Sequence, residues 1–226
     1  MLKSTTLTLI AAALYCLTFT TLQAFITDHM CEHVNSAKTC ETVQTKQPIV
    51  STEQQLHRAV DDYIKTKNPK SRLSTHALID ACHRYDVSLV FVLAQATIES
   101  NIGRDGLAKR TNSVWNVGSF DGHGYVQIGK IYKYPTVNHS IEPYLKTLTK
   151  YYLKDKTERD LLLDFSRRDG RRYATDVDYE RKLWTVIGQI ERTTDISRLY
   201  NVYRNDLLKR KLGRNDDVFT GVNHLR

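Results

Sequence analysis

The sequence predicts a mainly α-helical domain that carries one small β-hairpin lobe and follows an N-terminal hydrophobic segment. Three observations lead to this fold class. Apolar residues recur at helical spacing over most of the chain after residue 50. One stretch, residues 113–137, instead alternates apolar and polar residues and holds four of the ten glycines. Near the N-terminus, an uncharged apolar run follows Lys3.

Residues 1–27 are typical of an export segment. Lys3 is followed by no charged residue until Asp28, and an apolar stretch of about 20 residues lies between them. This arrangement fits a cleavable signal peptide or an uncleaved membrane anchor, and a positive charge before it directs the remainder out of the cytoplasm. We expect an exported protein, periplasmic or at the cell surface, which stays anchored in the inner membrane if the segment is uncleaved.

The rest of the chain divides into three parts. Residues 28–50 are polar and lack periodicity, which predicts a linker, and Cys31 and Cys40 within it either pair in an oxidising compartment or stay reduced. Residues 51–193 form the predicted domain. Residues 194–226 form a basic helical C-terminal extension.

Helical patterns fill most of the predicted domain. Ser51 and Gln54 stand at capping-box spacing, and the first helix stops before Pro69. The second helix is expected over Ser74–Arg84, and the third covers "DVSLVFVLAQATIES", with Asp86 or Ser88 as its cap. After the β-hairpin, helices are expected over Ser140–Lys154, Glu158–Arg167, Asp178–Arg192 and Ser197–Lys211.

Composition limits the partners. A chain of 226 residues with 41% hydrophobic residues can bury one sizeable core, and its net charge of +8 attracts an anionic partner such as nucleic acid, a membrane or cell wall. The basic patches at 167–172 and 207–214 lack the interleaved aromatic residues of a nucleic-acid site, so no nucleic acid is expected. The spacing of Cys31, His33 and Cys40 matches no standard zinc site, and neither a metal nor a cofactor is expected.

Glu99 is the strongest candidate for a catalytic residue. The helix before it is hydrophobic nearly all round, which predicts burial, and glutamate is rarely buried without a partner. The β-hairpin lobe follows directly, so Glu99 stands at the seam between two lobes, where ligands commonly bind. Partial desolvation there would raise its pKa, as a general acid requires.

Three segments in order resemble the glucosaminidase family of peptidoglycan hydrolases, glycoside hydrolase family 73. "LAQATIES" followed by "NIGRDGLAKRTNSVWNV" is similar to the family's first two motifs, with Asn116 where the family usually has glycine. "YPTVNHSIEPYLKTL" resembles its tyrosine-plus-helix segment, and "YATDVDYERKL" resembles its Tyr-Ala-Thr-Asp-x-x-Tyr motif. Together the matches cover roughly residues 73–193.

The resemblance implies a lysozyme-like helical domain with a small β-lobe. It implies an exported enzyme that cleaves β-1,4 glycosidic bonds of peptidoglycan glycan strands, of the endo-β-N-acetylglucosaminidase type, with Glu99 as general acid. A muramidase or lytic transglycosylase shares this fold, and a catalytically silent wall-binding protein is a further alternative. Asp121 is the candidate for a second acid, although Asp-Gly is also a common turn.

The same resemblance names the other site residues. Tyr173 is a candidate catalytic residue that would polarise the substrate N-acetyl group, and Tyr179 would border the cleft. Asn112 is a candidate substrate-binding residue, and Gln95 is either that or a packing residue behind the site. Trp115 would form either a sugar-stacking platform or a core anchor. Two mechanisms stay open: Asp121 activates water, giving inversion, or the 2-acetamido group of the substrate attacks, giving retention.

Overall fold

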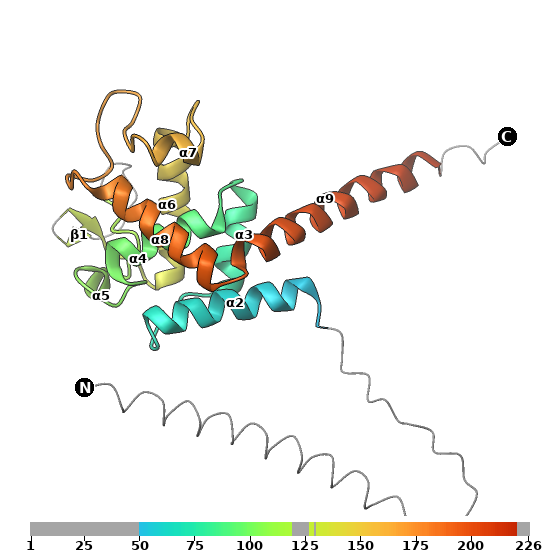
Figure 1. The fold of residues 1–226 in the computed structure, drawn as a ribbon, viewed down its shortest axis with the longest axis horizontal. Helices are drawn as coiled ribbons and strands as arrows, with labels where there is room; N and C mark the ends of the chain where they lie inside the picture. Colours follow the sequence, from blue (N-terminus) through green and yellow to red (C-terminus); the bar gives the residue numbers. More distant parts are fainter. Residues whose placement is uncertain (1–49, 119–126, 129, 221–226) are drawn as a thin grey trace, which may run out of the picture. The chain divides into compact units, whose positions relative to one another are not determined.

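The computed structural model divides the chain into two units, Met1–Gln47 and Pro48–Arg226. It describes residues 50–118, 127–128 and 130–220, so the predicted export segment, Cys31, Cys40 and Asp121 lie outside the described residues. The second unit is mainly helical with one small β-hairpin, which confirms the predicted fold class (Figure 1). In the described part of the chain, no helix combines the length and the apolar character needed to cross a membrane.

The first two helices begin at the caps that the sequence predicts. Helix α2 spans Thr52–Lys67, and Ser51 and Gln54 form the expected capping box. Helix α3 spans Thr75–Arg84, and the Ser74 side chain accepts a hydrogen bond from the Ala77 backbone. Both helices pack their apolar faces into one core, and this core holds helix α4 in place.

Helix α4, Leu89–Ser100, is the most buried helix. Ser88 caps its first turn, and nine of its twelve residues are buried because apolar side chains cover every face. Helix α8, Tyr179–Thr193, packs along it, as Figure 1 shows. The end of α4 therefore lies against residues that come about 80 positions later in the chain.

The β-lobe follows α4 through the short helix α5, Ala108–Thr111. Strands β1, Gln127–Ile128, and β2, Ile131–Tyr132, pair antiparallel, with Gln127 opposite Tyr132 and Ile128 opposite Ile131. Ile131 also forms an isolated antiparallel bridge with Gly118. The lobe is thus joined to the chain segment that leaves α5.

The helices after the lobe follow the prediction only in part. The 3₁₀ turn η1 (Val137–Ser140), helix α6 (Ile141–Thr147) and the π-helical turn η2 (Leu148–Tyr152) cover the first predicted helix. The helix predicted over Glu158–Arg167 is wrong beyond its first turn, because α7 spans only Glu158–Leu161. Phe165 instead turns into the core, and its backbone N–H donates to Glu180 Oε1 at 3.0 Å.

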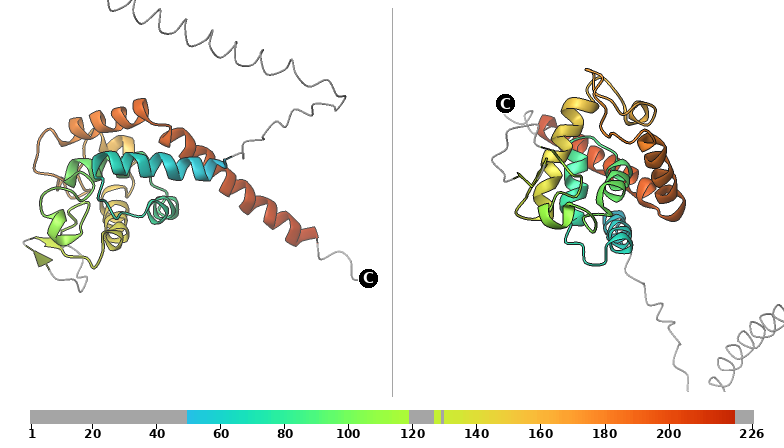
Figure 2. Two further views of the ribbon diagram at one scale, coloured as in Figure 1. Left: turned by 90° about the horizontal axis from the view of Figure 1, so that it is seen from below. Right: turned by 90° about the vertical axis from the view of Figure 1, so that its left-hand side faces the viewer.

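Helix α9, Ile196–Thr220, starts inside the core and ends outside it. Ile196, Leu199 and Tyr200 are buried, and the helix packs on α2. Its C-terminal half projects away from the other helices (Figures 1 and 2). The sequence placed residues 194–226 in an extension, but the first turns of α9 belong to the core.

Candidate active site

The chain reverses direction immediately after Glu99. Asn101, Ile102 and Gly103 all have positive φ angles, of 48°, 56° and 80°. The Ser100 hydroxyl fixes this turn by donating to Val114 O at 2.6 Å and accepting from Gly103 N at 2.8 Å. Glu99 therefore sits in the last turn of a buried helix with its side chain partly exposed.

Two side chains hold the Glu99 carboxylate. The Tyr179 hydroxyl donates to Oε1 at 2.8 Å, and Asn116 Nδ2 donates to Oε2 at 3.2 Å. Asn116 Nδ2 also donates to the Glu99 backbone oxygen at 2.9 Å, which fixes the amide in place. Burial raises the pKa of Glu99 above its ordinary value, and the two hydrogen bonds only partly oppose that shift. Glu99 thus keeps its proton to a higher pH than a solvated glutamate.

Behind Tyr179 lies a buried hydrogen-bond relay. The Tyr144 hydroxyl donates to Gln95 Oε1, and Gln95 Nε2 donates to the Tyr179 hydroxyl at 3.1 Å. Because Tyr179 accepts from Gln95, its own proton is directed at Glu99. Burial keeps the pKa of Tyr144 and of Tyr179 well above the usual range, so both hydroxyls stay protonated. We call Tyr144, Gln95, Tyr179 and Glu99 the relay.

Gln95 is a positioning residue in this arrangement. Its side chain is fully buried and both ends of its amide are occupied by tyrosine hydroxyls. A substrate cannot reach it without displacing the core. The prediction that Gln95 binds substrate directly is therefore corrected: it orients Tyr179.

Tyr173 lies beside the relay but outside it. Its half-buried ring stacks on Phe165 at 4.5 Å and lies 5.4 Å from the Tyr179 ring. Its hydroxyl donates to Trp115 O in a long contact of 3.4 Å. Burial raises the pKa of Tyr173 well above the usual range, and the nearby Glu99 charge adds to the shift. Tyr173 is thus a neutral phenol close to the acid.

Trp115 is a core residue. Its indole is 1% exposed, stacks on Tyr144 at 4.6 Å and donates from Nε1 to Val92 O at 3.0 Å. A sugar ring cannot stack on a face that another ring already covers. Of the two roles that the sequence left open, the stacking platform is wrong and the core anchor is right. The indole braces Tyr144, and so supports the relay.

Asn112 occupies a different place from the acid. Its Nδ2 donates to Tyr134 O at 2.8 Å and to Pro135 O at 3.3 Å, which ties α5 to the chain after β2. Asn112 lines two pockets among Lys70, Arg72 and Lys109 rather than contacting Glu99. Asp121 lies outside the described residues, so its predicted role as second acid stays a prediction.

Sequence reasoning missed two members of the site. Asn116 was noted only as a departure from a family glycine, and its φ of 50° explains why either residue fits, since asparagine and glycine both tolerate this conformation. Tyr144 was read only as part of a helix. Its chemical role depends on a contact with Gln95, 49 residues away, and no local signal could reveal it.

The described residues offer an acid but no metal site. No group of three or more His, Cys, Asp or Glu side chains among them could hold a metal ion. What this arrangement can do is donate a proton from a partly buried carboxyl group and then stabilise the resulting carboxylate with two fixed donors.

Comparison of the chain with known proteins identifies a protein family. The family model described as "Glucosaminidase: Mannosyl-glycoprotein endo-beta-N-acetylglucosaminidase" matches residues 75–192, just over half of the chain. A solved structure with similarity is the catalytic domain of the autolysin Auto from Listeria monocytogenes, 21% identical over 79% of this chain and 97% of that chain, with a TM-score of 0.36. Among curated proteins, none gives a significant match.

The matched range spans the whole candidate site. It includes Glu99 and Asn116 as well as Tyr144, Tyr173 and Tyr179. The residues that surround the acid are thus all within the segment that the family model covers. The chain belongs to the glucosaminidase family.

Proposed function

We propose that this protein is an exported peptidoglycan hydrolase that cleaves the β-1,4 bond after N-acetylglucosamine, with Glu99 as the general acid. One observation carries the proposal: Glu99 is a partly buried carboxyl group with a raised pKa, held by Tyr179 and Asn116. Membership of the glucosaminidase family supports the reaction class. The net charge of +8 suits an anionic wall polymer.

The site residues have distinct roles in this reaction. Glu99 gives its proton to the glycosidic oxygen as the bond to the leaving sugar breaks, and water supplies the new hydroxyl group. The carboxylate that remains accepts hydrogen bonds from Tyr179 and Asn116, which stabilise its charge. Hydrogen bonds that favour the ionised acid lower the barrier to proton transfer.

The group that attacks the anomeric carbon is either Asp121-activated water or the 2-acetamido group of the substrate. In the second route Tyr173, a protonated phenol near the acid, would hydrogen-bond the N-acetyl group. The stereochemistry of the first-formed product separates the two, because Asp121 acting as base inverts the anomeric centre. A large loss of rate in Asp121→Asn together with inversion supports the first route, and retention excludes it.

Glu99→Gln tests the proposal directly. The amide is nearly isosteric but has no proton of suitable acidity, so hydrolysis should fall roughly 10²–10⁴-fold. The measurement is release of fragments from purified cell wall, with mass spectrometry to identify the new reducing end. Glu191→Gln, an exposed position on α8, is the matched control and should keep full activity.

The outcomes distinguish the alternatives. Undiminished hydrolysis by Glu99→Gln contradicts the role of Glu99. No hydrolysis by either form favours a silent wall-binding protein. N-acetylmuramic acid or its anhydro form at the new end, in place of N-acetylglucosamine, identifies a muramidase or a lytic transglycosylase. Export is tested by a reporter fused after Ser51, which should be active only outside the cytoplasm.

A further inference from the structure

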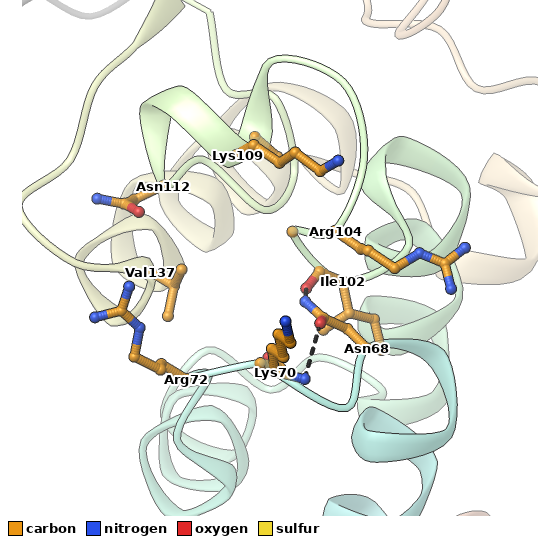
Figure 3. Close-up of a pocket in the computed structure, with 11 residues that line it drawn as sticks. Asn68, Lys70, Arg72, Ile102, Arg104, Lys109, Asn112 and Val137 are labelled. Carbon is orange, nitrogen blue, oxygen red and sulfur yellow. Dashed lines mark hydrogen bonds between the residues drawn. The ribbon is translucent and has the colours of Figure 1, made fainter.

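A groove lies on the other side of the turn that follows Glu99. It consists of two adjoining pockets of about 240 and 200 Å³, which share Arg72, Asn112 and Val137. The chain between α2 and α3 forms one wall, and the chain from Ile102 to Asn112 forms the other (Figure 3). We call it the basic groove, after four of its lining residues: Lys70, Arg72, Arg104 and Lys109.

Four cations line the groove, and the carboxylate of Asp105 lies near two of them, Arg104 and Lys109. Lys70, Arg72 and Lys109 are exposed, and no carboxylate of the described residues lies within ion-pair distance of any of them. Arg104 differs, since its guanidinium contacts Asp105 at 3.3 Å and Lys67 O at 3.0 Å. Figure 3 shows Lys70 and Arg72 on one wall of the pocket and Lys109 on the other, with the Arg104 side chain extending away from it. Like charges brought together in this way favour an anionic ligand.

Hydrogen bonds fix the backbone of both walls. Asn68 Nδ2 donates to Ile102 O at 2.9 Å in a buried contact that joins them. Lys65 Nζ donates to Ser71 O at 2.9 Å, which holds the chain that carries Lys70 and Arg72. A ligand therefore meets a preformed groove and orders only the lysine and arginine side chains.

The groove starts close to the acid. Ile102, which lines it, follows Glu99 by three residues, and Asn112 links its other end to the chain after β2. One short turn of the chain thus separates Glu99 from the groove, and the proposed substrate is a glycan strand bound at Glu99. The peptide stems of peptidoglycan are attached to that strand and carry several carboxylates, which are ionised at neutral pH.

We propose that the basic groove binds carboxylates of the peptide stem, and so selects glycan strands that still carry peptides. Lys70, Arg72 and Lys109 provide charge-assisted hydrogen bonds to these carboxylates. The proposal rests on the proposed function for its substrate. Its own prediction concerns binding and needs no cleavage.

Binding of two soluble probes tests it. The full chain with Glu99→Gln, which leaves the probe intact, is titrated by calorimetry with a disaccharide tetrapeptide and with the same disaccharide without peptide. The peptide-bearing probe should bind roughly tenfold tighter or better, as expected for one or more charge-assisted contacts. Lys70→Gln, Arg72→Gln and Lys109→Gln together should reduce that preference to near unity.

Controls separate the groove from net charge and from stability. Arg192→Gln, Lys209→Gln and Lys211→Gln remove the same charge from exposed positions outside the groove and should leave the preference intact. The double variant Lys70→Arg with Lys109→Arg keeps the positive charge and should also keep the preference for the peptide-bearing probe. Melting temperatures of all variants should match the parent, since the changed side chains are exposed.

Three results would overturn the proposal. The first is an unchanged preference for the peptide-bearing probe in the groove variant, in which Lys70, Arg72 and Lys109 are all replaced by Gln. The second is equal binding of both probes by the parent. The third is a glycerol-phosphate oligomer that binds the groove more tightly than the disaccharide tetrapeptide, which would assign the site to phosphate. A peptide preference in a protein that cleaves no wall would instead refute the proposed function and leave the groove assignment standing.

Discussion

The relay and the basic groove both include residues of one turn, 99–104, but the relay buries a single acidic group whereas the groove exposes several basic ones. In the relay one carboxyl group is surrounded by neutral donors in the core, so burial decides its protonation. In the groove four cations stand in solvent, and the carboxylate of Asp105 lies near two of them, Arg104 and Lys109. A buried charge acts at short range and responds to pH, whereas exposed charges act together and are weakened by salt. Under the two proposals, proton transfer takes place at one side of the turn and substrate selection at the other.

The pH profile should show the largest difference between the two regions. Only protonated Glu99 can act as acid, so the rate should fall about tenfold for each pH unit above its pKa. Because that pKa is raised, the alkaline limb should lie above the ordinary value of 4.5. Initial rates on purified wall between pH 4 and pH 9 measure it. The groove variant should keep the limb in place, and a wild-type limb at 4.5 or below would contradict the burial of the acid.

Tyr179→Phe should change the relay without reaching the groove. It removes a hydrogen bond that lowers the pKa of Glu99, so the alkaline limb should move to higher pH. It also leaves Gln95 Nε2 unpaired in the core, which should cost about 1–3 kcal/mol of stability. Thermal unfolding and the pH profile measure both effects.

Tyr200→Phe is the matched control for that variant. The Tyr200 hydroxyl donates to Val87 O at 3.2 Å in another buried contact, far from the relay in the hydrogen-bond network. This control variant should be less stable than the wild type, but the alkaline limb of its pH–rate profile should not move. If the alkaline limb moves equally in Tyr179→Phe and Tyr200→Phe, the shift results from general destabilisation of the core and not from loss of the hydrogen bond to Glu99.

Asn116→Gly should have the smallest effect. Glycine suits the φ of 50°, and the substitution also removes Asn116 Oδ1, a buried atom with no hydrogen-bond partner among the described residues. Stability should therefore change by less than about 1 kcal/mol. The lost hydrogen bond to Oε2 should move the alkaline limb slightly upward. Asn116→Ala, which puts an ordinary side chain at positive φ, should instead be less stable by roughly 1–2 kcal/mol.

The sequence predicted a carboxylate in the last turn of a buried helix because that signal is local. A run of apolar residues identifies α4 as buried, and Glu99 stands in the last turn of that helix. Ser51, Ser74 and Ser88 cap their helices as expected, since capping depends on residues within one turn. Local patterns were sufficient for these parts of the fold.

Long-range contacts could not be predicted in this way. Trp115 and Trp184 show the difference, since the indole considered for sugar stacking is buried and the other is 61% exposed. Nothing in either local pattern indicates which one the fold covers. The helix predicted beyond Leu161 failed for the same reason, because Phe165 is drawn into the core and Glu180 takes its backbone N–H. Tertiary packing overrode local propensity in both cases.

The contact between Tyr179 and Glu99 spans 80 residues of chain, and this separation has a consequence for how the protein is made. During synthesis the α4 segment emerges well before α8 does. Until α8 docks, Glu99 is a solvated glutamate with ordinary acidity, and it is deprotonated at neutral pH. The raised pKa of Glu99 is therefore a property of the completed tertiary structure. Under the proposed role of Glu99 as general acid, a nascent or partly unfolded chain lacks this raised pKa, so docking of α8 precedes activity.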